Sequence, residues 1–142
     1  MHRLHRIAKL LHGSMHDLSL KTPMLNGFPK GKCDYASTIS LVVLYCNDFK
    51  GVSYINQIDE DYMDNHVWLE YMEYCIDLTI DQFTNEIPLV SDGVWQRTNF
   101  PHSSSNSITD SECAYVKCLE LLEQWGLVYA LEHIQARIDA SN

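Results

Sequence analysis

The chain has 142 residues, of which 46% are hydrophobic and 20% are charged, and these values predict a single globular domain over residues 1–142. The formal net charge of −9 argues against binding to nucleic acid, because phosphate backbones are bound by clustered Lys and Arg. No segment approaches the roughly 20 apolar residues that span a bilayer, and charges interrupt the basic N-terminus, so we expect a cytoplasmic protein without a membrane segment or a secretory signal.

The first third of the chain predicts two helices joined by a loop. Apolar residues recur at helical spacing over residues 3–19, which indicates an amphipathic helix. Two prolines and two glycines within residues 22–32 indicate a loop. From Cys33 to about Tyr45 the chain has no Gly and no Pro, and we expect a second helix there. Its apolar or small face comprises Ala36, Ile39, Ser40, Val43 and Leu44, and its β-branched residues make it depend on burial.

The middle of the chain predicts strands. Residues 52–58 suit one strand, and the acidic residues that follow it (Asp59, Glu60, Asp61 and Asp64) indicate a loop. Residues 66–71 and 74–79 are rich in β-branched and aromatic side chains and predict two further strands. We expect these two to form a hairpin that turns at Met72-Glu73. This turn is inferred from the flanking strands, because tight turns favour Asn, Asp or Gly.

The last third predicts a short helical turn at 80–86, a strand at 87–95 and a polar loop from Arg97 to Asp110. Thr109 or Asp110 then caps a long helix through about Ile138, in which Gly126 allows a kink. The expected class is therefore α+β, with an antiparallel sheet of three to four strands. We expect the sheet to pack against the helix that begins at Cys33 and against the long C-terminal helix.

Five cysteines occur, at positions 33, 46, 75, 113 and 118, without a Cys-x-x-Cys pair. Their odd number and the lack of a secretory signal predict reduced thiols, most of them in the core. Cys33 differs from the others because it directly follows a Pro/Gly loop and begins a helix. A helix N-terminus favours the thiolate, so Cys33 is the candidate nucleophile, with a buried structural thiol as the alternative.

The predicted hairpin supplies a base for this thiol. Alternation places His66, Trp68 and Glu70 on one face of their strand. If Met72 and Glu73 form the turn, Trp68 pairs with Asp77, and Asp77 then lies diagonal to His66 on the same face. A hydrogen bond from the imidazole to this carboxylate would fix the tautomer of His66 and aim its other nitrogen at the thiol. A register slip of one residue would separate the pair.

Residues 27–85 resemble the core of transglutaminase-like cysteine enzymes, which are related to papain-like enzymes. The resemblance rests on Cys33-x-x-Ala36-Ser37, on Asn65-His66-Val67-Trp68-Leu69-Glu70, and on Ile76-Asp77-Leu78-Thr79 with Gln82-Phe83. Members of this superfamily share a Cys on a helix followed by His and Asp on adjacent strands. A Gly-x-Cys-Trp type signature is missing at Cys33, and Asp34 follows the thiol.

The resemblance implies that Cys33 is the nucleophile, His66 the general base and later acid, and Asp77 the orienting carboxylate. The implied activity is that of a cysteine hydrolase or acyltransferase acting on an amide of a protein or peptide through a thioester, without a cofactor. Peptidase, amidase, deamidase and transferase remain alternatives, as does a non-catalytic binding module with the same shell. The Cys33 N–H is one candidate oxyanion donor, and Gln57 or Asn65 could be the second.

Two other groups of residues are weaker candidates. His12 and His16 are spaced for one helix face but lack the Glu of a His-Glu-x-x-His motif, so we expect a solvated face and no metal site. Cys75 should share a face with Asp77 and is a rival nucleophile to Cys33.

Overall fold

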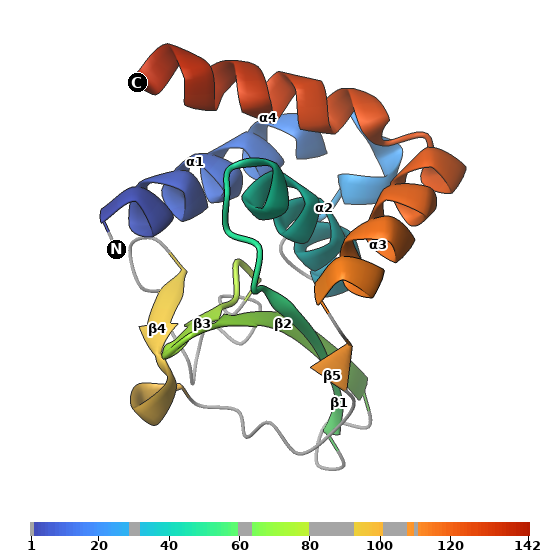
Figure 1. Ribbon diagram of the computed structural model, residues 1–142. Helices are drawn as coiled ribbons and strands as arrows, with labels where there is room; N and C mark the ends of the chain where they lie inside the picture. Colours follow the sequence, from blue (N-terminus) through green and yellow to red (C-terminus); the bar gives the residue numbers. More distant parts are fainter. Residues whose placement is uncertain (1, 29–31, 60–63, 80–92, 101–107, 110) are drawn as a thin grey trace.

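The computed structural model describes residues 2–28, 32–59, 64–79, 93–100, 108–109 and 111–142. Within them, an antiparallel sheet forms one layer, and four α-helices lie on one of its faces (Figure 1). The central helix α2 (Cys33–Cys46) contacts the sheet on one side. On its other sides α2 contacts α1 (His2–Ser19), α3 (Ser111–Trp125) and α4 (Val128–Ser141). The predicted α+β class with an antiparallel sheet is confirmed.

The sheet has the strand order β4-β3-β2-β1-β5, and every neighbouring pair is antiparallel. Its strands are β1 (Ser53–Asp59), β2 (Asp64–Tyr71), β3 (Tyr74–Ile76), β4 (Val94–Gln96) and β5 (Ile108–Thr109). Four of these strands have three or more residues, as the sequence predicts, and the two-residue β5 adds an edge beside β1. None of the helices in the described parts of the chain has the length and apolar content that crossing a membrane requires.

Helix α2 is buried on nearly all sides, not only on the face predicted from sequence. Leu41 and Val42 are as buried as Ile39 and Leu44, although they lie outside the predicted face. A helix that is apolar all round belongs in the interior, and α2 fills that place between the sheet and the other helices. Burying a large apolar side chain stabilises the fold by about 1.5–3 kcal/mol, and this gain offsets the weak helix propensity of the β-branched residues in α2.

The hairpin between β2 and β3 forms in the predicted register, with Leu69 opposite Ile76 and Tyr71 opposite Tyr74. Met72 and Glu73 form the turn, and Met72 has a φ of 53°, which L-residues rarely adopt. The side chain of Arg97 donates a hydrogen bond of 2.5 Å to the carbonyl of Met72. Contacts from the end of β4 therefore hold a turn whose own residues do not favour it.

The prediction of one long C-terminal helix is wrong, because the chain forms two helices, α3 and α4, in its place. Gly126 has a φ of 69° and ends α3. The N–H of Leu127 donates to the carbonyl of Leu122 at 2.8 Å, and the N–H of Gly126 donates to that of Glu123 at 3.2 Å. These two bonds make a Schellman motif, in which glycine stops a helix rather than kinking it.

Other boundaries also differ from the prediction. The expected acidic loop is shorter, since Asp59 and Asp64 pair as the last residues of β1 and the first of β2. The polar loop from Arg97 to Asp110 contains a 3₁₀ turn, η3 (Arg97–Asn99), and β5. The loop at 22–32 likewise holds a 3₁₀ turn, η1 (Pro23–Leu25). The helical turn predicted at 80–86 and the first part of the strand predicted at 87–95 lie outside the described residues.

Gly93 fixes the chain after β3, and its replacement by alanine should destabilise the protein. Its carbonyl accepts a 2.9 Å hydrogen bond from the N–H of Asp77, and its φ is 73°. A Cβ atom here would lie 2.6 Å from Leu78 Cδ2. We expect Gly93→Ala to lower the free energy of unfolding by about 1–3 kcal/mol in urea titrations.

Gly13 provides the matched control, because it is exposed within α1 and a Cβ there meets nothing within 4 Å. Gly13→Ala should raise the free energy of unfolding by about 0.5–1 kcal/mol. Equal effects of the two substitutions would contradict the strain assigned to Gly93.

Candidate active site

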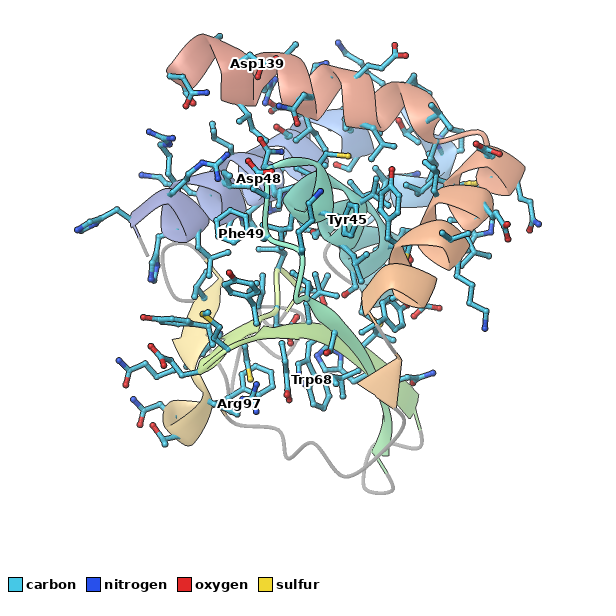
Figure 2. The ribbon with its side chains drawn as sticks, viewed as in Figure 1. Tyr45, Asp48, Phe49, Trp68, Arg97 and Asp139 are labelled. Atoms are coloured by element: carbon cyan, nitrogen blue, oxygen red, sulfur yellow. The ribbon has the colours of Figure 1, made fainter. Side chains whose placement is uncertain are left out.

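The face of the sheet opposite the helices carries a row of aromatic and charged side chains. Figure 2 shows Trp68 and Arg97 pointing to this side, away from α2. His66 shares the face with Trp68, as predicted, and their ring centroids lie 5.7 Å apart. Glu70 is also buried there, with the indole N–H of Trp68 at 3.4 Å and the Arg97 guanidinium at 3.3 Å. The indole N–H of Trp68 and the carboxylate of Glu70 therefore each have a partner.

His66 and Asp77 form the closest polar contact in this row. His66 Nε2 lies 2.5 Å from Asp77 Oδ2, and the two side chains are 5% and 1% exposed. Leu69 and Ile76 are the last pair of this hairpin, and the same register carried one residue further sets Asp77 diagonal to His66. The structure thus brings together two of the three residues proposed from sequence, with the geometry expected of a histidine and its orienting carboxylate.

The carboxylate of Asp77 is also held from its other side. Its Oδ1 accepts hydrogen bonds from the backbone N–H of Thr79 at 3.0 Å and from the Thr79 hydroxyl at 3.1 Å. Sequence reasoning did not single out Thr79, although Asp-x-Thr is a known pattern of Asx turns, in which an Asp side chain bonds the N–H two residues on.

Cys33 is the first residue of α2, and it is 7% exposed. Its thiol accepts a hydrogen bond from the backbone of Val67, the residue after His66. One turn later along α2, the hydroxyl of Ser37 donates to the carbonyl of Val67 at 3.3 Å. The pairing of β2 with β3 ends at Leu69, so the first turn of α2 bonds the backbone of β2 just beyond that point. Cys33 therefore lies beside the strand segment that carries His66.

Burial and, to a smaller extent, the negative charge of Asp34 together raise the pKa of the Cys33 thiol from 9.0 to about 12. The thiol also donates a hydrogen bond to Asp34 Oδ1 at 3.4 Å, which favours its protonated form. The Val67 backbone bond lowers the pKa, but its effect is smaller. At neutral pH this thiol is protonated, so a nucleophilic role requires a base.

The other cysteines are less suited to the site. Burial raises the pKa of Cys75 to about 12 and that of Cys118 to about 11. Cys75 shares the face of Asp77, as expected, and packs with Ile55 and Trp68 in an apolar cluster. Cys46 is exposed near the end of α2, far along the helix from Cys33. The side chains of Cys113, Gln57 and Asn65, and with them the second oxyanion donor, lie outside the described residues.

His12 and His16 pack against an aromatic ring. Their own ring centroids lie 4.6 Å apart, and that of Phe28 lies 5.6 Å from His12 and 4.8 Å from His16. Among the described residues, no group of three or more His, Cys, Asp or Glu side chains is arranged to hold a metal ion. The pair thus contributes to packing between α1 and the segment that follows it.

Comparisons of the chain with protein-family models, with curated proteins and with solved structures found no match. The resemblance to transglutaminase-like enzymes accordingly rests on the residues themselves, and the geometry above is the basis for any functional proposal.

Replacing Asp34 should make the Cys33 thiol more acidic. Asp34→Asn removes a negative charge and weakens an acceptor that holds the thiol proton, so the pKa of Cys33 should fall. The rate of iodoacetamide labelling at Cys33, followed against pH by peptide mass spectrometry, should rise at a lower pH than in the unchanged protein.

Asp48→Asn is the control for this substitution, because Asp48 is exposed at the other end of α2 and asparagine tolerates its φ of 72°. It should leave the labelling profile of Cys33 where it was. An unchanged profile in Asp34→Asn would show that Asp34 does not control the thiol.

Proposed function

We propose that this protein is a cysteine hydrolase or acyltransferase of the transglutaminase-like kind, acting on an amide of a protein or peptide. In this proposal Cys33 is the nucleophile, His66 the general base and Asp77 the carboxylate that orients His66. The observation that carries the proposal is the buried 2.5 Å contact between His66 Nε2 and Asp77 Oδ2 on the strand segment beside Cys33.

The nitrogen of His66 that contacts Asp77 supports this assignment. Because Nε2 faces the carboxylate, Nδ1 is the ring nitrogen nearer to the main chain of β2. The Cys33 thiol is hydrogen-bonded to the next backbone position, that of Val67. Nδ1 is thus the nitrogen assigned to receive the thiol proton, while Asp77 stabilises the imidazolium that results.

The proposed reaction proceeds by acyl transfer. The thiol proton moves to His66 as the sulfur bonds to the amide carbon, and the C=O electrons move onto the oxygen. The tetrahedral intermediate collapses, the C–N bond breaks, and His66 returns the proton to the leaving amine. Water or a second amine then attacks the thioester and gives its proton to His66. The C–S bond breaks, and the Cys33 thiolate that leaves takes this proton back from His66.

The raised pKa of Cys33 determines how this reaction would start. A thiol with a pKa of about 12 does not rest as a thiolate at neutral pH. His66 must therefore remove the proton as the sulfur attacks, rather than hold a preformed ion pair. The net charge of −9 favours a neutral or basic substrate over an acidic one. We propose that the protein acts in the cytoplasm.

A non-catalytic binding module is the second candidate function. The slight exposure and raised pKa of Cys33 favour it, because both describe an unreactive structural thiol. A hollow of about 600 Å³ between α2 and α4 offers a surface for a partner. Val42, Val43, Leu131 and Ala136 line it with apolar side chains, and Glu132 and Asp139 add negative charge. Figure 2 marks the position of Asp139 on α4.

Labelling of Cys33 separates the two functions. If His66 is the base, Cys33 should react with iodoacetamide near neutral pH faster than Cys75 and Cys118, which are similarly buried. His66→Ala should slow that reaction by about 10²-fold or more, the range that general-base catalysis supplies. His133→Ala changes a histidine on α4 and is the matched control, which should leave the rate unaltered.

A rate at Cys33 equal to those of Cys75 and Cys118, and insensitive to His66→Ala, would reject the catalytic proposal in favour of the binding module.

A further inference from the structure

The two hydrogen bonds from Thr79 to Asp77 have no role in the chemistry described so far. Both reach the same oxygen, Oδ1, at 3.0 Å from the backbone N–H and 3.1 Å from the hydroxyl. Asp77 and Thr79 are each 1% exposed, so water does not replace these bonds readily. By donating two hydrogen bonds to one buried oxygen, Thr79 fixes the orientation of the Asp77 carboxylate.

Orientation is the property that the Asp77 side chain lacks by itself. Rotation about the bond to an Asp carboxyl group is broad, so the side chain by itself does not fix the plane of the carboxylate toward His66. The N–H of Asp77 donates to the carbonyl of Gly93 at 2.9 Å, but this main-chain contact does not fix the plane of the carboxylate. With both Thr79 donors on Oδ1, Oδ2 is the oxygen directed at His66 Nε2.

The same bonds affect the proton on His66. An ionised carboxylate can only accept hydrogen bonds, at Oδ1 from Thr79 and at Oδ2 from His66. Nε2 must then carry the ring proton in the contact with Asp77 Oδ2, and Nδ1 becomes the basic nitrogen. The tautomer that the reaction needs is therefore set two residues beyond Asp77.

We propose that Thr79 is a positioning residue that fixes the Asp77 carboxylate and thereby holds His66 in the Nε2–H tautomer. As a contribution to catalysis this inference rests on the proposed function, but its effect on the tautomer of His66 does not.

The experiment compares Thr79→Val, which keeps the shape of the side chain and removes the hydroxyl donor, with Thr79→Ser, which keeps the donor. Thr79→Ala removes the donor with a smaller side chain and serves if valine prevents folding. The ¹⁵N chemical shifts of the His66 ring report the tautomer directly. Thr22→Val is the matched control, since Thr22 is also buried and bonds the hydroxyl of Tyr129, far along the chain from His66.

We expect the Nε2–H tautomer to dominate in the unchanged protein, in Thr79→Ser and in Thr22→Val, and to be mixed with the Nδ1–H tautomer in Thr79→Val and Thr79→Ala. The rate of iodoacetamide labelling at Cys33 should fall roughly tenfold or more in the last two variants, the loss expected for one hydrogen bond to a charged group. Recovery in Thr79→Ser separates a lost donor from a disturbed fold.

Unchanged ring shifts in both Thr79→Val and Thr79→Ala would overturn the inference. If the tautomer shifts in Thr79→Val and Thr79→Ala but His66→Ala leaves the labelling rate of Cys33 unchanged, Thr79 has its positioning role and the proposed function is rejected. If the labelling rate of Cys33 depends on His66 but not on Thr79, and the tautomer is unchanged, the proposed function is supported and the positioning role of Thr79 is rejected.

Discussion

The hydrogen bond between His66 and Asp77 depends on the register of the β2–β3 hairpin, since successive residues of a strand face opposite sides of the sheet. In the observed register both side chains lie on the face away from the helices, and a slip of one residue would separate them. The turn that sets this register uses Met72 at a φ of 53°, which costs free energy locally. Arg97 offsets that cost by bonding the Met72 carbonyl and pairing with Glu70. The site thus depends on contacts outside the hairpin.

The burial of α2 acts on the site in two opposite ways. Because α2 fills the space between the sheet and the other helices, its first residue, Cys33, is brought against the backbone of Val67. The same burial removes water from the thiol and raises its pKa, and Asp34 adds to the effect. A buried thiol with a raised pKa stays protonated at neutral pH and is not a resting thiolate.

The elements with strong periodic patterns were predicted well from the sequence, and the exceptions have physical reasons. α1 follows from its apolar spacing, α2 from its apolar face and the absence of Gly and Pro, and the β2–β3 hairpin from its β-branched and aromatic residues. The C-terminal prediction is wrong because Gly126 adopts a left-handed conformation that ends α3, which periodicity does not reveal. β5 was not predicted because two residues carry no pattern, and only pairing with β1 makes them a strand.

For the candidate site, the sequence by itself determined which residues share a face. Alternation on β2 and β3 was enough to place Asp77 within reach of His66, because side-chain direction in a hairpin follows from local pairing alone. The tertiary structure decided the surroundings of these residues. The position of Cys33 beside Val67, its raised pKa and the fixing of Asp77 by Thr79 and Gly93 all depend on burial and on the turn that follows β3. Those are properties of packing, which a pattern of residues along one strand does not contain.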